Sequence, residues 1–194
     1  MESTITKEAI STLDPETFEG RIIMIQSLPE AEKAVKYLSE HPMIGFDTET
    51  RPAYKKGSHY SVSLIQLSTE NTCFLFRLNM IGFPKCLVDL LSNPEIKKIG
   101  LSLRDDFAAI NRRQTFTPNG FIDLQKIVQE YGITDISLQK VYAILFHKKI
   151  SKNQRLTNWE ADILTDSQKK YAALDAWACL KIYKKLHDKI ILTS

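Results

Sequence analysis

The stretch Met43-Ile-Gly-Phe-Asp-Thr-Glu49 predicts a largely buried strand that carries two carboxylates. The residues before the first carboxylate are mostly apolar, as in a strand that lies in a protein interior. Residues two apart on a strand share a face, so Asp47 and Glu49 project together. The same pair also suits a strand end that emerges into solvent at residues 50–52. Taken alone, this stretch leaves both interpretations open.

Strand-like and helical segments alternate on both sides of this strand, which favours an α/β or α+β architecture. Two capping boxes mark helix starts, one at Ser27 and Glu30 and one at Thr165 and Gln168. The expected strands are residues 21–25, 43–49, 62–67, 72–78 and 96–101, with a hairpin between the third and the fourth. The expected helices are residues 28–41, 84–91, 105–113, 123–131 and 138–146, and a last helix that starts at the capping box of Thr165 and has no Gly or Pro from residue 168 to about 189.

The length and composition of the chain fit one globular domain. Its 194 residues are enough for a full hydrophobic core, and 43% hydrophobic with 25% charged residues is typical of soluble proteins. Residues 1–19 have weak periodicity and no clear partner face, so we expect a poorly ordered N-terminal arm there. We expect residues 20–194 to form a single domain.

Charge and cysteine content bear on partners and compartment. A net charge of +3 neither requires nor opposes a nucleic-acid partner, because an acidic pocket can lie inside a basic rim. The three cysteines are far apart and odd in number, so we expect no disulfide partner and a cytoplasmic location. Residues 1–13 are too polar for a signal peptide, and no run reaches the ~18 apolar residues of a membrane span.

A further acid follows a second strand–turn–helix junction, after Lys98-Ile-Gly-Leu-Ser-Leu-Arg104. Taken alone, Asp106 fits a helix N-terminal acid that interacts with the macrodipole, an effect worth ~0.3–1 kcal/mol. Composition does not choose between Asp106 and its neighbour Asp105.

The final predicted helix carries Tyr171 and Asp175 four residues apart, so they share one face. Alanines surround them, and such small neighbours let a helix approach another element closely. An exposed Asp beside a half-buried Tyr is the alternative, and for this pair alone it is the simpler interpretation.

Taken together, the four acids indicate a metal site more strongly than any of them does alone. Acids without partner His or Cys favour a hard cation, Mg²⁺ or Mn²⁺ rather than Zn²⁺. Clustered carboxylates repel one another unless they are neutralised, and two divalent ions balance four negative charges. Two ions ~3.5–4 Å apart suit in-line phosphoryl displacement. Tyr171, with an ordinary pKa of ~10, fits a group that positions the attacking water.

Three ordered motifs over residues 20–190 resemble the DEDD 3′–5′ exonucleases, in the subclass with Tyr in the third motif, which includes ribonuclease D and the Werner-syndrome exonuclease domain. The matching segments are Phe46-Asp-Thr-Glu49 with Ser63-Leu-Ile-Gln-Leu67, then Lys98-Ile-Gly100 followed by Asp106, then Tyr171-Ala-Ala-Leu-Asp175, preceded by Arg155-Leu-Thr-Asn-Trp159 and Leu164-Thr-Asp-Ser-Gln168. The distance from Gly100 in the second motif selects Asp106 over Asp105.

This resemblance implies a ribonuclease-H-like α/β fold, with a mixed five-stranded sheet flanked by helices. It also implies metal-dependent release of nucleoside 5′-monophosphates from the 3′ ends of DNA or RNA. By residue match, Asp47, Glu49, Asp106 and Asp175 are the ligands of two Mg²⁺ or Mn²⁺ ions, and Tyr171 is the water-positioning residue.

Four other residues are expected to contact substrate: Thr48, Phe107, Lys152 and Arg155. The two cations belong to a basic loop, and Arg155 also matches a family position. The basic loop either contacts the substrate phosphates or is simply exposed to solvent, and the sequence does not choose between these alternatives. Phe107 either packs or wedges against a terminal base.

Two other functions compete with an exonuclease. One is an endonuclease or ribonuclease-H-type activity at the same metal site. The other is a catalytically weak nucleic-acid-binding module of the same fold. The presence of all four acids with Tyr171 argues against the second, because a decayed site usually loses a ligand.

Overall fold

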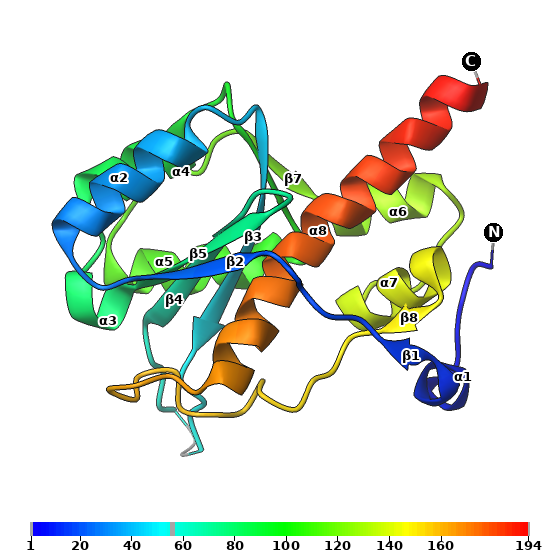
Figure 1. Cartoon of the computed structure of the whole chain (residues 1–194), viewed down its shortest axis with the longest axis horizontal. Helices are drawn as coiled ribbons and strands as arrows, with labels where there is room; N and C mark the ends of the chain where they lie inside the picture. Colours follow the sequence, from blue (N-terminus) through cyan, green and yellow to red (C-terminus); the bar gives the residue numbers. More distant parts are fainter. Residues whose placement is uncertain (1, 55–56, 194) are drawn as a thin grey trace.

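A mixed β-sheet forms the centre of the computed structural model, which describes the backbone of residues 2–54 and 57–193 and side chains as far as residue 187 (Figure 1). The sheet has six strands in the order β2-β5-β4-β3-β6-β7. They are β2 (Arg21–Ile25), β3 (Met43–Thr50), β4 (Val62–Ser68), β5 (Thr72–Arg77), β6 (Lys97–Gly100) and β7 (Phe121–Asp123). A second, two-stranded sheet joins β1 (Asp14–Pro15) to β8 (Lys148–Lys149).

Strand β3 lies inside the six-stranded sheet, antiparallel to β4 and parallel to β6. The register places Gln66 opposite Asp47 and Leu64 opposite Glu49. An irregularity in the pairing between Glu49 and Thr50 ends the regular ladder just beyond the second carboxylate. Residues 43–45 of β3 pair with β6, whereas Asp47 and Glu49 lie in the part of the strand that pairs with β4 alone.

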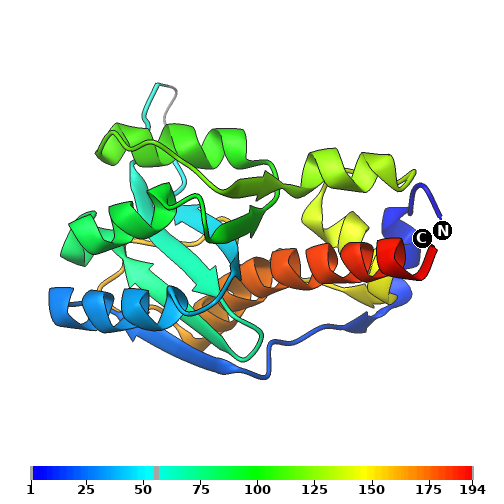
Figure 2. The same ribbon diagram turned by 90° about the horizontal axis from the view of Figure 1, so that it is seen from above.

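Helices cover both faces of the sheet, and Figure 2 shows the layers from above. The helices are α1 (Lys7–Thr12), α2 (Leu28–Leu38), α3 (Leu78–Ile81), α4 (Lys85–Ser92), α5 (Leu103–Arg113), α6 (Leu124–Glu130), α7 (Leu138–Phe146) and α8 (Asp166–Thr193). Apolar residues of α2, α4 and α5 form one core cluster with one face of the sheet. Residues of α6, α7 and α8 form a second cluster with the other face. None of the helices within residues 2–54 and 57–193 is long and apolar enough to cross a bilayer.

Helix α8 packs directly against the backbone of β3. A Cβ built on Gly45 would lie 1.9 Å from the carbonyl oxygen of Ala176 and 2.8 Å from its carbonyl carbon. No real side chain fits that space, so glycine at this position lets the two backbones meet. Ala172, Ala173 and Ala176 are fully buried along the same part of α8, as the expectation of a close helix approach required.

Both predicted capping boxes are confirmed. The Glu30 carboxylate accepts a hydrogen bond from the backbone N–H of Ser27 at 3.0 Å, and this box begins α2. In the second box, the Gln168 backbone N–H donates to the Thr165 hydroxyl at 3.2 Å, and the Thr165 backbone N–H donates to the Gln168 side chain at 3.0 Å. Because this box satisfies N–H groups of the first turn, α8 begins at Asp166, directly after the first residue of the predicted capping box.

The expected mixed sheet flanked by helices is confirmed, but it has six strands and not five. The additional strand, β7, pairs in parallel with β6 at the edge of the sheet. It has only three residues, too few for an alternating pattern to show in the sequence. Its partner strand and not its own periodicity determines its conformation.

The prediction of an N-terminal arm without a partner face is wrong for residues 7–19. This segment contains α1 and β1, and β1 pairs with β8 at the start of the predicted basic loop. Glu16 accepts hydrogen bonds from the Tyr142 hydroxyl, from Lys148 at 3.0 Å and from Lys181 at 3.1 Å. Burial opposes the charge of Glu16, but these three donors outweigh it and lower the pKa of Glu16 to about 2. Single hydrogen bonds between distant residues leave no periodic pattern in the sequence, and so the sequence did not reveal these contacts.

We expect Gly45→Ala to destabilise the fold by about 1–3 kcal/mol or more, because the added methyl group collides with the backbone of α8. Gly100→Ala is the matched control. A Cβ there lies 2.4 Å from a side-chain methyl of Leu103 and 3.2 Å from the carbonyl oxygen of Phe46, so the severe overlap is with a side chain and not with backbone, and we expect a smaller loss. Urea denaturation of both variants checks the expectation, and equal stability of the two would contradict it.

Candidate active site

Three of the predicted metal ligands meet in one cluster. Asp47 and Glu49 come from β3, and Asp175 comes from α8; each offers a carboxylate oxygen, and these oxygens lie within 4.8 Å of one another. Glu49 and Asp175 are buried and Asp47 is half-buried. The alternation along β3 turns its two acids toward α8, and the close contact at Gly45 brings Asp175 to them.

The electrostatics of the cluster are those of acids packed together away from water. Burial raises the pKa of Asp47 well above its usual range, and the charges of Asp175 and Asp106 raise it further. Glu49 is shifted in the same direction, by burial and then by the charges of the other three acids. Burial raises the pKa of Asp175 to about 7, although interactions with Tyr171 and Lys152 oppose the rise. Without a cation, protons relieve the repulsion, and so a cation and protons compete for the same oxygens.

Asp106, the fourth predicted ligand, lies beside this cluster. It is in the first turn of α5, and its carboxylate accepts a hydrogen bond from the Thr48 hydroxyl on β3. Burial raises the pKa of Asp106 to about 6, although the bond from Thr48 opposes the rise. Asp105 is exposed. The structure therefore places Asp106, and not Asp105, next to Asp47, in agreement with the family register.

Asp123 holds the start of α5 in place, and the sequence did not reveal this role. Ser102, the N-cap residue of α5, has a left-handed backbone (φ 64°, ψ 42°), and its side chain makes no capping hydrogen bond. Asp123 replaces that cap, because its two carboxylate oxygens accept from the backbone N–H groups of Ser102 at 3.0 Å and Leu103 at 3.1 Å. It also caps α6 through Gln125 at 3.0 Å. Asp123 thus connects the end of β7 to the helix that carries Asp106.

Tyr171 lies one turn before Asp175 on α8, as predicted from their spacing. Its ring packs 6.0 Å from that of Trp159, which is completely buried, as expected of a packing residue. Burial raises the pKa of the Tyr171 hydroxyl far above its ordinary value of 10, and the charges of Asp175, Glu49 and Asp47 raise it further. A hydroxyl in this setting keeps its proton and acts by hydrogen bonding.

The basic loop passes close to the carboxylates. Lys152 opposes the rise in the pKa of Asp175, and Arg155 opposes that of Glu49, so each cation lies near one acid of the cluster. Both side chains are exposed. Their expected contact with substrate stays a prediction.

Two buried side chains anchor the segment that joins this loop to α8. Arg77, at the end of β5, is completely buried and donates to the backbone carbonyl groups of Ala161 and Asp162. Gln168 donates from its amide to the Thr157 hydroxyl at 2.9 Å. Neither residue was expected at the site, since nothing in the sequence connects Arg77 to a loop 84 residues away.

Two of the side chains that were predicted to contact substrate interact with other residues of the protein. The Thr48 hydroxyl binds Asp106, as described above. The Phe107 ring packs edge-to-face at 4.8 Å from Phe121 and at 6.1 Å from Phe116, which corresponds to the packing alternative. A direct role in substrate binding stays a prediction for both residues.

The donor set fits divalent cations. Carboxylate oxygens are the ligands that Mg²⁺ and Mn²⁺ prefer, and the cluster offers no nitrogen or sulfur ligand among the residues that the structure describes. One oxygen of Asp175 is fully buried and has no hydrogen-bond partner in the described part of the chain. Burying a carboxylate oxygen without a hydrogen-bond partner costs free energy, and coordination to a cation would offset that cost.

We expect the metal-free protein to lose stability as the pH rises from about 4 to about 7. Asp106 and Asp175 have pKa values of about 6 and about 7 in the folded state, above the ordinary value of 3.8 that applies to the unfolded chain. In this window the folded state binds more protons, so its stability falls with pH, by about 1.4 kcal/mol per proton and pH unit. Urea denaturation in EDTA at several pH values measures the slope.

Asp175→Asn should flatten that slope markedly, whereas Asp105→Asn, at an exposed position, should change it much less, since the charge of Asp105 raises the pKa of Asp106 less than burial does. Mn²⁺ at pH 7.5 should restore stability to the unmodified chain. A stability that rises over this window in EDTA would contradict the electrostatic interpretation of the cluster.

We expect Asp123→Ala to lower stability by about 1–2 kcal/mol, the usual cost of a lost helix cap, because two backbone N–H groups of α5 lose their acceptor. Asp123→Asn keeps one acceptor oxygen, so its stability should lie between those of Asp123→Ala and the unmodified chain. Asp89→Ala, at an exposed ion pair, is the control with little effect. Thermal unfolding compares the three variants, and an unchanged midpoint for Asp123→Ala would refute the capping role.

Comparison with known proteins leads to the same family that the sequence motifs indicate. A family model described as 3′–5′ exonuclease matches residues 22–191. A Mus musculus protein named bifunctional 3′–5′ exonuclease/ATP-dependent helicase WRN is 36% identical over 155 residues, which are 77% of this chain and 11% of that protein. This chain thus spans only a small part of that relative.

Solved structures show the same fold at low sequence identity. The Aedes aegypti Nibbler EXO domain superposes with a TM-score of 0.84 at 19% identity, over 92% of this chain and 94% of that one. Escherichia coli RNase D superposes with a TM-score of 0.79 at 23% identity, over 89% of this chain and 46% of that one. Because the family model matches residues 22–191, and the acidic cluster joins the first and third motifs with Asp106 of the second beside it, this chain belongs to the 3′–5′ exonuclease family.

Proposed function

We propose that this chain hydrolyses phosphodiester bonds at the 3′ ends of DNA or RNA and releases nucleoside 5′-monophosphates with two divalent cations, Mg²⁺ or Mn²⁺. The observation that carries the proposal is the convergence of Asp47, Glu49 and Asp175 within 4.8 Å, with Asp106 and Tyr171 beside them. Family membership supports the reaction class. The scattered cysteines support a reducing, cytoplasmic setting.

The four acids would hold the cations. The charges of Asp47, Asp175 and Asp106 all act on Glu49, and those of Asp175 and Asp106 also act on Asp47, as expected of ligands that share one site. When bound, the pair of cations lowers the pKa of a water molecule and stabilises the leaving 3′ oxygen. Thr48 keeps the Asp106 carboxylate oriented toward this position through its hydrogen bond.

Tyr171 would orient the attacking water. Its hydroxyl keeps its proton, because burial and the neighbouring acids raise its pKa, and so it can donate to or accept from a water without acting as the base. Lys152 and Arg155 lie at the edge of the acidic cluster and would attract the substrate phosphates. They thereby offset the repulsion between a polyanion and a site built from acids.

A labelled-oligonucleotide assay tests the proposal. Single-stranded DNA and RNA, labelled at the 5′ or the 3′ end, are incubated with Mg²⁺, Mn²⁺ or EDTA. We expect a ladder that shortens from the 3′ end with either metal and is absent in EDTA. Equal cleavage in EDTA, internal cleavage of a 3′-blocked strand, or no cleavage with any metal would refute it, and binding without cleavage would favour the nucleic-acid-binding module.

Single Asn substitutions test the ligand set. Asp47→Asn and Asp106→Asn should each lower the rate at least about 100-fold, because each removes a charged ligand from a site that stabilises the transition state by several kcal/mol. Asp105→Asn is the matched control, since its side chain is exposed beside Asp106, and its loss should stay below about threefold. A large loss for Asp105→Asn with a small one for Asp106→Asn would reverse the assignment.

A further inference from the structure

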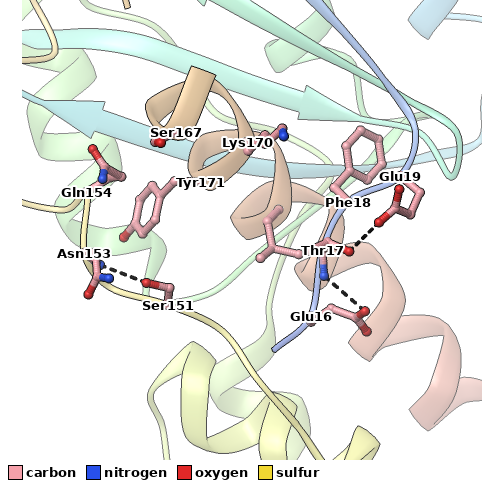
Figure 3. Close-up of a pocket in the computed structure, with 11 residues that line it drawn as sticks. Glu16, Thr17, Phe18, Glu19, Ser151, Asn153, Gln154, Ser167, Lys170 and Tyr171 are labelled. Atoms are coloured by element: carbon pink, nitrogen blue, oxygen red, sulfur yellow. Dashed lines mark hydrogen bonds between the residues drawn. The ribbon is translucent and has the colours of Figure 1, made fainter. Parts of the chain in front are cut away.

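A cavity of about 340 Å³ lies between the N-terminal segment, the basic loop and the start of α8 (Figure 3). Residues 16–19 form one wall, and Asn153 and Gln154 of the loop form another. Ser167, Lys170 and Tyr171 of α8 complete it. Its volume is that of a small-molecule site.

The cavity and the carboxylate cluster share a wall. The Tyr171 ring lines the cavity, and its hydroxyl interacts with Asp175 of the cluster. The basic loop also faces both sites. Lys152 and Arg155 lower the pKa values of acids in the cluster, whereas Asn153 and Gln154 line the cavity. When the scissile phosphate of a nucleic-acid strand lies at the acids, the neighbouring nucleotide of that strand is therefore close to this cavity.

The wall made by residues 16–19 lies outside residues 22–191, the part of the chain that matches the family model. It is nevertheless firmly held. Glu16 binds three donors, on α7, β8 and α8, and its backbone N–H donates to the carbonyl oxygen of Lys149 at 2.9 Å. Phe18 is buried against Trp177 of α8 at 5.7 Å. The N-terminal segment thus adds a fixed wall to this side of the site.

The lining offers groups that suit the base and sugar of a nucleotide, and Lys170 beside them can attract its phosphate. Side-chain amides of Asn153 and Gln154 offer donors and acceptors that suit the edge of a base. The Tyr171 ring offers an aromatic surface. The Glu19 carboxylate accepts hydrogen bonds from amino and hydroxyl groups, whereas that of Glu16 is already paired with Lys148 and Lys181. We propose that this cavity binds a nucleoside of the substrate strand next to the scissile phosphodiester, an inference that rests on the proposed function.

Filling the cavity tests the inference. Thr17→Trp places a large ring at an exposed position of the N-terminal wall, and Ser167→Trp does so from α8. Thr12→Trp is the matched control, because Thr12 is exposed in the same segment and does not line the cavity. Thermal unfolding of all three proteins verifies that they are folded.

Binding is measured first, by fluorescence anisotropy of a labelled single-stranded oligonucleotide in Ca²⁺ buffer. The lost contacts of one nucleoside should weaken binding about tenfold in Thr17→Trp and in Ser167→Trp, and leave Thr12→Trp unchanged. Unchanged affinity in both cavity variants would overturn the inference whether or not the protein cleaves. Lack of cleavage by the unmodified chain, with weaker binding in the cavity variants, would instead overturn only the proposed function.

Kinetics then distinguish which nucleoside the cavity takes. The substrates are the same oligonucleotide and the p-nitrophenyl ester of thymidine 5′-monophosphate, in which p-nitrophenol replaces the retained strand. A KM raised about tenfold for the oligonucleotide alone assigns the cavity to the retained strand. A KM raised for both substrates assigns it to the released nucleotide. A KM raised for neither would overturn the inference.

Discussion

The structure depends on the direct contact between the backbones of α8 and β3 at Gly45 and Ala176. Two of the three clustered acids belong to one partner of this contact and the third belongs to the other, so the contact determines how far apart they are. A bulkier residue at position 45 would move the helix outward and separate the carboxylates. The same glycine therefore serves the core and the candidate active site.

This packing forces like charges together, and the fold compensates the cost in several ways. The pKa values of all four acids are raised, which shows that the metal-free site is unfavourable for charge. The hydrophobic clusters on both faces of the sheet supply the stability that holds the acids in place. Thr48, Lys152 and Arg155 lower the cost locally. Cations would relieve the repulsion among these acids, so the cluster is suited to bind them.

Sequence patterns predicted the parts of the structure that depend on local or repeated signals. The alternation of β3 foretold that Asp47 and Glu49 share a face, and the capping box at Thr165 foretold the start of α8. Asp106 was distinguished from Asp105 only by family register, because both positions of α5 look alike until the fold buries one of them. Asp123, Arg77 and Glu16 were missed, since each acts through hydrogen bonds to segments that are remote in the sequence or to backbone groups.

The contact between Glu16 and Lys181 spans 165 residues. Closing so long a loop costs entropy that only a nearly complete fold can repay. During synthesis, which begins at the N-terminus, Glu16 leaves the ribosome long before its partner on α8 exists. The β-sheet can assemble from segments that emerge earlier, but the first residues must wait for the last helix. The wall that residues 16–19 provide beside Tyr171 is therefore among the last features of the molecule to form, and a chain whose folding stops early has its sheet without this wall.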